Sequence, residues 1–386
     1  MKLSIKFDDP RAEVEISRFG NSSTANEFHI IVKPLATGSF SEQLDTTQTV
    51  YLKTLEQLGI KNGSAIWRRF FLSDVINQCI ELERHPLGSR EECAVSMIGQ
   101  APMNGSKMVL LAYHVVDNDS DITQIGKSTW KRTRGKLQHV WSTGLTDPGE
   151  HSTHEQTVSV FDQYTHELSH IRGTLLNEAV RTWLHVRDVD HNYAGVVSGR
   201  NEVFDREGLN PHSHYIASTG IEARLAHPQA RVSMDTYSVS GLSQGQIQYL
   251  QAADYLSRTD RYGVRFERAT AISYQDRKHI FISGTASIDS NGEVLHKNDV
   301  VNQLARAIEN VDALLKEAKA GLSDMQHWLI YLRDPADSRV IKREWKIRMG
   351  DTPSIIVAGS VCRPDWLIEV EGLAIVENND PGFPQF

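Results

Sequence analysis

Two stretches of this chain repeat one order of residue types, and this internal repeat limits the possible folds more than any other feature. Residues 180–190 read VRTWLHVRDVD, and residues 325–337 read MQHWLIYLRDPAD. Each holds a Trp within an apolar run rich in strand-forming residues, then Arg-Asp and a turn. Each also follows a segment with the apolar spacing of a helix, 301–315 in the later copy and, less regularly, 158–171 in the earlier one. A repeat of this length indicates copies of one supersecondary unit.

The repeat extends upstream of these stretches. Residues 281–292 read FISGTASIDSNG and residues 97–105 read MIGQAPMNG, and both end in Asn-Gly, a strong hairpin signal. We therefore predict two copies of one α+β unit, over about 93–220 and about 265–376. Residues 64–74, SAIWRRFFLSD, follow a helix-like stretch and are a candidate third copy. Chance similarity in strand composition is the alternative explanation.

Each copy reads as a sheet with helices on one face. Near the C-terminus Ile368 and Val370 alternate with Glu369 and Glu371, as expected for a strand whose two faces meet different surroundings. The segment 208–263 is rich in Pro, Gly and Ser, and we predict that it links two units and lies over a site. The predicted domains are 1–92, a diverged N-terminal unit; 93–263, a middle unit with the linker; and 264–386, a C-terminal unit.

Composition excludes several classes of protein. A chain of 386 residues suits two or three domains better than one core, and 40% hydrophobic with 23% charged residues is typical of a folded soluble protein. The formal charge of −8 argues against broad nucleic-acid binding, which requires dense Lys and Arg. We find no run of about 18 apolar residues that would predict a membrane span. The N-terminus MKLSIKFDDP also lacks the apolar core of a signal peptide.

The cysteines point to a reducing compartment. Cys79, Cys93 and Cys362 form no CxxC pair, and their number is odd. This pattern argues against a disulfide framework or a thiolate zinc site, so we predict a cytoplasmic protein. Because the overall charge is negative, an anionic substrate would need a local group of Arg side chains.

One stretch carries a family pattern. RKHIFISGTASID, GEVLH, DVVNQLARAIENVDALLKEAKAGLSDMQHWLIYLRD and WLIEVEGLAIV occur in this order within residues 277–376. The stretch resembles the Rid/YjgF family. The resemblance implies trimers of an α+β unit with clefts between neighbours, so three fused copies are expected to form an intramolecular pseudo-trimer. It also implies hydrolysis of enamines and imines with the help of an Arg before the last strand. Ile355 stands near that position here, whereas the acid of the last strand is kept as Glu369.

A second group of motifs suggests a narrower relationship. The motifs are RTW at 181–183, GR at 199–200, ASTGI at 217–221, FERAT at 266–270, SGTAS at 283–287 and VCRPDWLIEVE at 361–371. In this order they resemble the chorismatases, although this chain is longer at the N-terminus and has Glu222 where the family favours Gly. The resemblance implies cleavage of chorismate to pyruvate and a cyclic or aromatic acid, without a cofactor. It places the family's acid on Glu369 and its variable Cys position on Cys362.

The chemistry of such a substrate defines what the site must contain. Chorismate is a dianion with an enolpyruvyl ether, and its cleavage requires a proton at the methylene carbon. A carboxyl group can deliver this proton near neutral pH only if burial against apolar walls raises its pKa. Glu369, on an apolar strand, fits this role. The alternative is that Glu369 and Glu371 line a solvated sheet face.

Two carboxylates require paired donors, and the planar guanidinium of Arg suits them better than Lys. The candidates, each of which could instead form a surface ion pair, are Arg181, Arg200, Arg224, Arg265 and Arg363. Tyr193 and Tyr215 are candidate neighbours, and Thr219 with Gly220 could bind an anion through backbone N–H groups. Cys362 could shape the pocket, act as a nucleophile or fill apolar space.

Residues 166–170 read His-Glu-Leu-Ser-His, which matches the HExxH zinc motif. Asn177 stands where the third His of the longer motif belongs, and Glu178 is too close to serve as a separated acidic ligand. The segment also falls in the helix of the repeat, which packs on the outside in Rid-like units. We therefore expect neither a metal site nor a zinc protease.

Three functions remain open. The first is a chorismatase-like hydrolase or lyase of secondary metabolism with Glu369 as general acid, which needs at least two Arg nearby. The second is a Rid-type hydrolase of another small enolic, iminic or aromatic substrate, which needs one. The third is a non-catalytic protein that binds a small ligand. The expected partner is a small anionic molecule, without nucleic acid, membrane or cofactor. The chain is expected to be a monomer with an internal pseudo-trimer, or a weak homo-oligomer.

Overall fold

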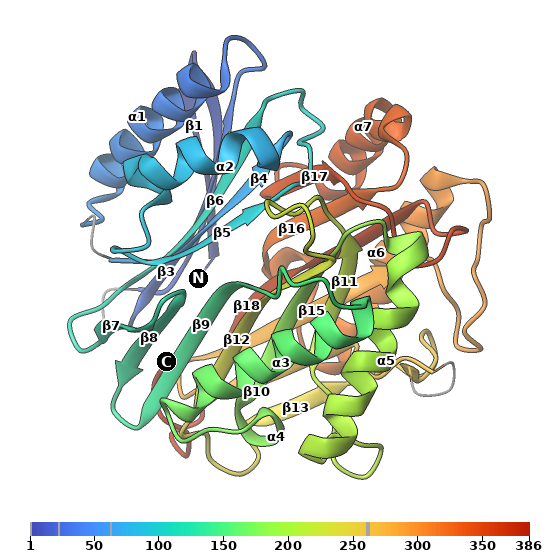
Figure 1. Cartoon of the computed structure of the whole chain (residues 1–386). Helices are drawn as coiled ribbons and strands as arrows, with labels where there is room; N and C mark the ends of the chain where they lie inside the picture. Colours follow the sequence, from blue (N-terminus) through green and yellow to red (C-terminus); the bar gives the residue numbers. More distant parts are fainter. Residues whose placement is uncertain (1, 22–23, 62–63, 260–262) are drawn as a thin grey trace.

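A computed structural model describes residues 2–21, 24–61, 64–259 and 263–386 of the chain (Figure 1). The strands form three six-stranded sheets that follow one another along the sequence. We call each sheet with its helices the first, second and third unit. Within the described ranges, no helix is long and apolar enough to cross a membrane.

The elements of the three units follow in chain order. The first unit comprises β1 (Lys2–Asp9), β2 (Ala12–Phe19), β3 (Asn26–Pro34), α1 (Phe40–Leu58), β4 (Ala65–Leu72), α2 (Val75–Arg84), β5 (Ala94–Ile98) and β6 (Met108–Val116). The second comprises β7 (Asp121–Gly126), β8 (Thr129–Arg134), β9 (Leu137–Thr146), α3 (Thr153–Ser169), α4 (Leu175–Glu178), β10 (Ala179–Val186), α5 (Val189–Glu207), β11 (Ala217–Glu222) and β12 (Val232–Ser240). The third comprises β13 (Ile247–Leu250), β14 (Ala269–Ser273), β15 (Arg277–Ala286), α6 (Val300–Glu317), β16 (Met325–Leu332), α7 (Ser338–Met349), β17 (Ser354–Ala358) and β18 (Ile368–Glu377).

All three units share one topology. The sheet orders are β1-β2-β3-β6-β4-β5, β7-β8-β9-β12-β10-β11 and β13-β14-β15-β18-β16-β17. In each unit the fourth and fifth strands in chain order run parallel and are joined by a helix; these pairs are β4 with β5, β10 with β11, and β16 with β17. The other neighbouring strands in each sheet are antiparallel. The fold is therefore α+β and is made of three fused copies of one unit. The candidate third copy at the N-terminus is confirmed, since residues 64–74 contain β4.

The first helix between the third and fourth strands of each unit begins at a cap that the sequence supplies. Ser39 and Glu42 form a capping box at α1, and Ser152 and Glu155 form another at α3. At α6 the side chain of Asp299 accepts a hydrogen bond from a backbone N–H in the first turn. These caps fix where each helix begins, so its apolar stripe faces the sheet.

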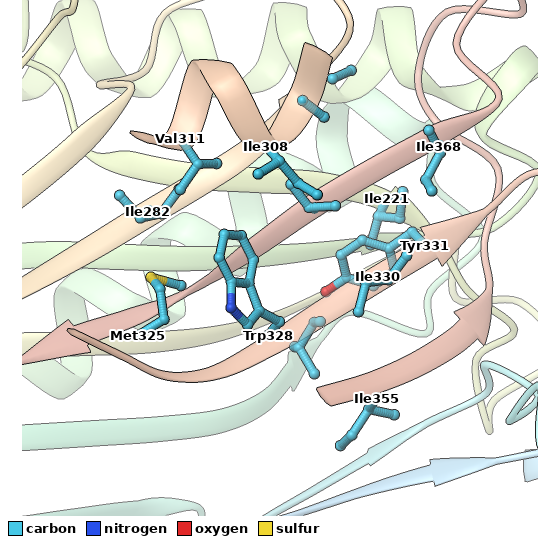
Figure 2. Close-up of a cluster of buried hydrophobic side chains, with 14 of the residues drawn as sticks. Ile221, Ile282, Ile308, Val311, Met325, Trp328, Ile330, Tyr331, Ile355 and Ile368 are labelled. Atoms are coloured by element: carbon cyan, nitrogen blue, oxygen red, sulfur yellow. The ribbon is translucent and has the colours of Figure 1, made fainter. Parts of the chain in front are cut away.

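The third unit shows how a helix and a sheet share one core. Ile308 and Val311 point from α6 toward Ile282 and Trp328 of the sheet (Figure 2). Trp328 is fully buried in this cluster. The first and second units have matching clusters of their own beneath α1 and beneath α3 with α5. Each sheet thus buries one face under its own helices.

The opposite sheet faces meet one another around a central axis. One apolar cluster contains residues of all three units, among them Tyr113, Trp141, Tyr237, Phe281 and Leu373. A sheet covered by helices on one face must bury its other face elsewhere, and here the fused copies cover one another. The chain therefore closes into an intramolecular pseudo-trimer, as the sequence predicted.

The predicted unit boundaries are wrong. Residues 94–116 contain β5 and β6, which complete the first sheet, so the first unit extends to Val116 rather than to residue 92. The segment 208–263 is not a linker, because its described residues contain β11, β12 and β13; residues 260–262 lie outside the described ranges. The units are joined instead by the short connections 117–120 and 241–246. Pro and Gly mark turns between short strands as well as linkers, and here they mark turns.

The repeat identified the right strands but not always the right register. Trp183 and Trp328 occupy β10 and β16, the same strand of two units, but they face opposite sides of their sheets. Trp328 lies in the core under α6, whereas Trp183 packs against the axial cluster. An offset of one residue moves a strand side chain to the other face. The proposed match of 97–105 with 281–292 is also wrong. The first segment contains the end of β5, the fifth strand of its unit, whereas the second contains the end of β15, the third strand of its unit.

Candidate active site

A cavity of about 410 Å³ lies at the interface between the second and third units. Its volume is within the range of small-molecule sites in proteins. The second unit contributes side chains from α5 and β11, and the third contributes the segments around β15 and the start of β18. Residues that matter for its chemistry are Tyr193, Arg200, Thr219, Gly220, Arg268, Gly284, Cys362, Arg363, Trp366 and Glu369.

Glu369 lies in the wall of this cavity. It pairs with Ala286 across β18 and β15 and is only 5% exposed. Gly284 leaves the space for its carboxyl group, since a Cβ at position 284 would lie 2.3 Å from Oε1 of Glu369. Burial, and then the charge of Glu371, raise the pKa of Glu369 to about 8. Glu369 is therefore protonated at neutral pH, and the alternative of a solvated sheet face is wrong.

Glu371, two residues further along β18, is surrounded by donors. Arg181 Nη2 lies 2.6 Å from its Oε2, and Trp183 Nε1 donates to its Oε1 at 2.9 Å. The Tyr331 hydroxyl also donates to Oε1, at 3.0 Å, and the Thr219 hydroxyl donates to Oε2. Donors on both oxygens match a buried carboxylate, so Glu371 is the fixed charge beside Glu369.

Thr219 connects this network to the cavity. Its hydroxyl oxygen accepts from the backbone N–H of Gly284 at 2.9 Å and from Arg181 Nη2 at 2.5 Å. Thr219 therefore acts through its side chain from strand β11, and not through the backbone of a loop as the sequence suggested. Gly220 beside it allows α5 to approach, because a Cβ there would lie 2.9 Å from Cε2 of Tyr193.

Arg200 is the most buried of the three Arg side chains among the described residues that line the cavity, and it remains a candidate anion ligand. It is 2% exposed, and its Nε and Nη2 have no hydrogen-bond partner among the described residues. A buried guanidinium with free donors is costly unless something accepts those hydrogen bonds. Arg268 and Arg363 also line the cavity; Arg268 donates to the carbonyl of Ser257 at 3.0 Å. The wall thus offers cationic groups from both units.

Cys362 lies beside the Tyr193 hydroxyl in the same wall. Burial, followed by the nearby Glu369 charge, raises the pKa of the Cys362 thiol to about 12. The thiol is therefore protonated at neutral pH, which argues against a nucleophilic role, because the thiolate is the reactive form.

The structure brings most of the predicted site residues together, but not all. Arg181 lies behind the cavity and reaches it only through Glu371 and Thr219. Tyr215 is buried in the core of the second unit, outside the cavity lining. Arg265 lies outside it as well and pairs with Asp205 of α5. Two features of the site were not predicted from the sequence: the place of Arg268, from the FERAT motif, in the cavity wall, and the role of Glu371.

The pseudo-trimer has two further interfaces, and strand register identifies their equivalent positions. The equivalent residues are Leu373, Tyr113 and Tyr237. Each follows the same irregularity in strand pairing, where Leu373 pairs with His327, Tyr113 with Trp67 and Tyr237 with Arg181. Two residues before these positions, Glu371 of the third unit corresponds to Leu111 of the first unit and Asp235 of the second. Four residues earlier, Glu369 corresponds to Val109 and Ser233. The proposed acid therefore occurs once in the three copies.

The interface between the first and second units keeps only the buried carboxylate. Asp235 accepts hydrogen bonds from Ser96, Gly144 and Arg69, at 2.5, 2.8 and 3.1 Å. Ser96 and Gly144 are the register equivalents of Thr219 and Gly284. This network repeats the one around Glu371 but has Ser233 in place of the acid.

The interface between the third and first units also contains a cavity of about 410 Å³, but its chemistry is different. Val109 and Ile355 line it at the positions of Glu369 and Thr219. Its buried Glu15 is paired with Lys33 at 2.8 Å and with the backbone N–H of Ser354 at 2.9 Å. This cavity therefore offers neither a protonated acid at the strand position nor a buried unpaired guanidinium.

The HExxH match forms no metal site within the part of the chain that is described. His166 lies in α3 and His170 caps its C-terminal end, and their rings stack edge to face at 5.3 Å. No group of three or more His, Cys, Asp or Glu among the described residues could hold a metal ion.

Comparison with known proteins agrees with this architecture. Residues 268–376 match the family described as Endoribonuclease L-PSP. A RutC family protein of Pyrococcus abyssi is 35% identical over 100 residues, which cover 25% of this chain and 79% of that protein. The third unit belongs to this family, the Rid/YjgF family. The 3-aminoacrylate deaminase RutC of Acinetobacter baylyi is 29% identical over 99 residues, again 25% of this chain and 79% of the deaminase.

Two further matches extend beyond the third unit. The crystal structure of a chorismatase covers 81% of this chain and 93% of its own, with a TM-score of 0.63 and 18% identity, so the two proteins share a fold. The 3-hydroxybenzoate synthase of Streptomyces hygroscopicus is 24% identical over 221 residues. That match covers 50% of this chain and 63% of the synthase, which is less than two thirds of its length.

Proposed function

We propose that this chain is an enzyme that cleaves chorismate, or a closely similar enol ether with two carboxylates, to pyruvate and a cyclic or aromatic acid. The observation that carries the proposal is the buried Glu369, whose pKa is raised to about 8, in one cavity with Arg200, whose Nε and Nη2 have no hydrogen-bond partner among the described residues. An acid and a candidate anion ligand in one cavity match the needs of an anionic substrate that must be protonated on carbon.

The reaction begins with transfer of the Glu369 proton to the methylene carbon of the enol ether. This step forms an oxocarbenium ion and leaves Glu369 as a carboxylate. Water can then add to the ether carbon and return a proton to Glu369, and collapse of the hemiketal releases pyruvate and a ring alcohol. A hydroxybenzoate and pyruvate together contain the same atoms as chorismate, so an aromatic product would consume no water.

Arginine side chains would hold the substrate's carboxylates. Arg200 lines the cavity, and the Nε and Nη2 atoms on one edge of its guanidinium have no hydrogen-bond partner among the described residues, so this edge would take one carboxylate after a small shift of the side chain. Arg363 extends from the third unit, with its guanidinium carbon 4.6 Å from the centre of the Trp366 ring. Together with Arg268 this arrangement provides the second cationic region that a dianion needs. The likeness to a chorismatase fold and to 3-hydroxybenzoate synthase supports this substrate class.

The alternative is a Rid-type enamine hydrolase, which the family of the third unit favours. An enamine is also protonated on its terminal carbon, so Glu369 would perform the same first step. The two functions differ in the number of carboxylates on the substrate and in the leaving group, which is ammonia for a primary enamine.

The decisive experiment incubates the purified chain with chorismate and measures pyruvate with a coupled dehydrogenase assay. We expect pyruvate from the parental protein and none above background from Glu369→Gln. Glu293→Gln, an exposed position in the same unit, is the matched control and should retain full activity. Absence of pyruvate from the parental protein, together with ammonia release from an enamine such as 3-aminoacrylate, would replace the first function with the second.

A further inference from the structure

Arg69 of the first unit lies at the central axis, away from the cavity that holds Glu369. It is buried on β4, and its Nη2 lies 3.1 Å from Oδ2 of Asp235 in the second unit. Its guanidinium carbon lies 4.4 Å from the centre of the Trp183 ring, a distance typical of a cation–π contact. Because Arg69 does not line the cavity, it can influence the site only through other side chains.

Trp183 is the side chain that connects Arg69 to the site. Its Nε1 donates to Oε1 of Glu371 at 2.9 Å. Arg181 also lies over the Trp183 ring, at 4.7 Å, and its Nη2 is 2.6 Å from Oε2 of Glu371. Asp235, Arg69, Trp183, Arg181 and Glu371 thus form one continuous line of contacts. The line joins Asp235, the buried carboxylate at one interface, to Glu371, the buried carboxylate at another. Between them, Arg69 and Arg181 both contact the indole ring of Trp183.

The line matters because of the position of Glu371. Glu369 and Glu371 are two residues apart on β18, so both carboxyl groups project from the same face of the strand. After burial, the charge of Glu371 is the next cause that raises the pKa of Glu369, because two neighbouring buried carboxyl groups do not both ionise readily. Donors stabilise the ionised form, so the proton remains on the group with fewer donors. Glu371 is the group that Arg181, Trp183, Thr219 and Tyr331 surround, which leaves the proton to Glu369.

We propose that Arg69 is a positioning residue for this acid pair. By holding the Trp183 indole in place, it keeps the Nε1 donor on Glu371 and thereby keeps the proton on Glu369, which lies in the cavity wall. The first unit, whose described residues contribute no side chain to the cavity lining, then supports the chemistry of the other two. This inference rests on the proposed role of Glu369 as the acid.

Two changes interrupt the line without leaving a buried charge unpaired. Trp183→Phe removes the Nε1 donor and keeps an aromatic ring beneath both guanidinium groups. The double variant Arg69→Met with Asp235→Asn removes both members of the ion pair together. Arg18→Met, which removes a first-unit Arg that lies over Phe28, is the matched control.

Kinetics with chorismate and substrate-free infrared difference spectra test the proposal separately. In both disrupted proteins we expect kcat to fall about 10-fold or more while KM changes less than about two-fold, since the proton and not substrate binding is affected. In the parental protein, the band of a protonated carboxyl group should disappear on Glu369→Gln. In the disrupted proteins we expect a second such band, which disappears when Glu371→Gln is added. Arg18→Met should behave as the parental protein.

An unchanged kcat in both disrupted proteins would overturn the proposal, and so would a single band that still belongs to Glu369. The infrared spectra need no substrate. If chorismate is not turned over, they still decide whether Arg69 and Trp183 direct the proton, so this inference and the proposed function can fail independently.

Discussion

Replacing Glu369 by Gln should make the folded chain more stable while it removes the proposed acid. The pKa of Glu369 is raised from 4.5 to about 8, mainly because burial disfavours the charged form. The native state therefore binds the proton more tightly than the unfolded chain, and stability falls as the pH rises from about 4.5 to about 8. Gln is close to the neutral carboxyl group in shape but does not ionise, so the variant does not incur this loss.

The size of the effect follows from the two pKa values. Each pKa unit corresponds to about 1.4 kcal/mol, so the full difference is about 5 kcal/mol. At about pH 5 only the first part of the ionisation has occurred in the unfolded chain, and the variant should be about 1 kcal/mol more stable. At about pH 9 nearly the whole difference should be present, about 5 kcal/mol.

Chemical denaturation followed by tryptophan fluorescence, at acidic, neutral and alkaline pH, measures this difference. Glu293→Gln is again the control, since that side chain is exposed and should give the same stability change at each pH. Our reasoning is refuted if Glu369→Gln gains no stability between acidic and alkaline conditions. The same outcome would mean that Glu369 ionises normally, and it would remove the acid from the proposed mechanism. A gain in stability with a loss of activity is typical of an active-site group held in an unfavourable environment.

Two further substitutions test the geometry of the site. Gly284→Ala places a Cβ 2.3 Å from Oε1 of Glu369, so the carboxyl group must move, and we expect turnover to fall about 100-fold while the circular dichroism spectrum is unchanged. Gly321→Ala, whose Cβ would lie 4.0 Å from Oγ of Ser323 in ordinary van der Waals contact, should retain activity. Cys362→Ala should keep turnover within about five-fold of the parental rate, because the protonated thiol is not expected to attack the substrate. Complete loss of activity in Cys362→Ala would instead indicate a covalent role for this residue.

The fold could be predicted from the sequence because its strongest signals are local and repeated. The strand that is followed by Arg-Asp in β10 and β16, and by Ser-Asp in β4, recurs because these strands occupy the same place in three sheets. The apolar spacing of 301–315 predicted α6 for the same reason, since one face of that helix must be buried. The alternation around Glu369 correctly separated the two faces of β18.

The sequence does not predict which residues surround the face of β18 that carries Glu369 and Glu371. Glu369 and Glu371 look alike in the sequence, and both could have faced solvent. Their difference depends on donors from distant residues, Arg181, Trp183 and Tyr331, which reach Glu371 and not Glu369. Arg265 and Arg200 also look equivalent, but the first reaches an exposed carboxylate of Asp205, whereas the second is buried among the residues that line the cavity. Partners so far apart in the chain are not visible in local patterns.

A trimer of identical units would have three equivalent interfaces, whereas this fused chain has made its interfaces unequal. At the position of Glu369 the other interfaces have Ser233 and Val109, and at that of Glu371 they have Asp235 and Leu111. A buried carboxyl group without hydrogen-bond donors destabilises the fold. Such a group is present as Glu369 at the interface where we propose catalysis, and it is absent from the equivalent positions of the other two interfaces. The buried Asp235 persists because its donors satisfy it and because Arg69 binds it while packing against Trp183. On this view the first and second units both serve the one site between the second and third units. The second unit lines the cavity, and the first unit contributes Arg69. A substitution at Val109 or Ser233 should therefore affect stability only, whereas one at Arg69 should affect turnover.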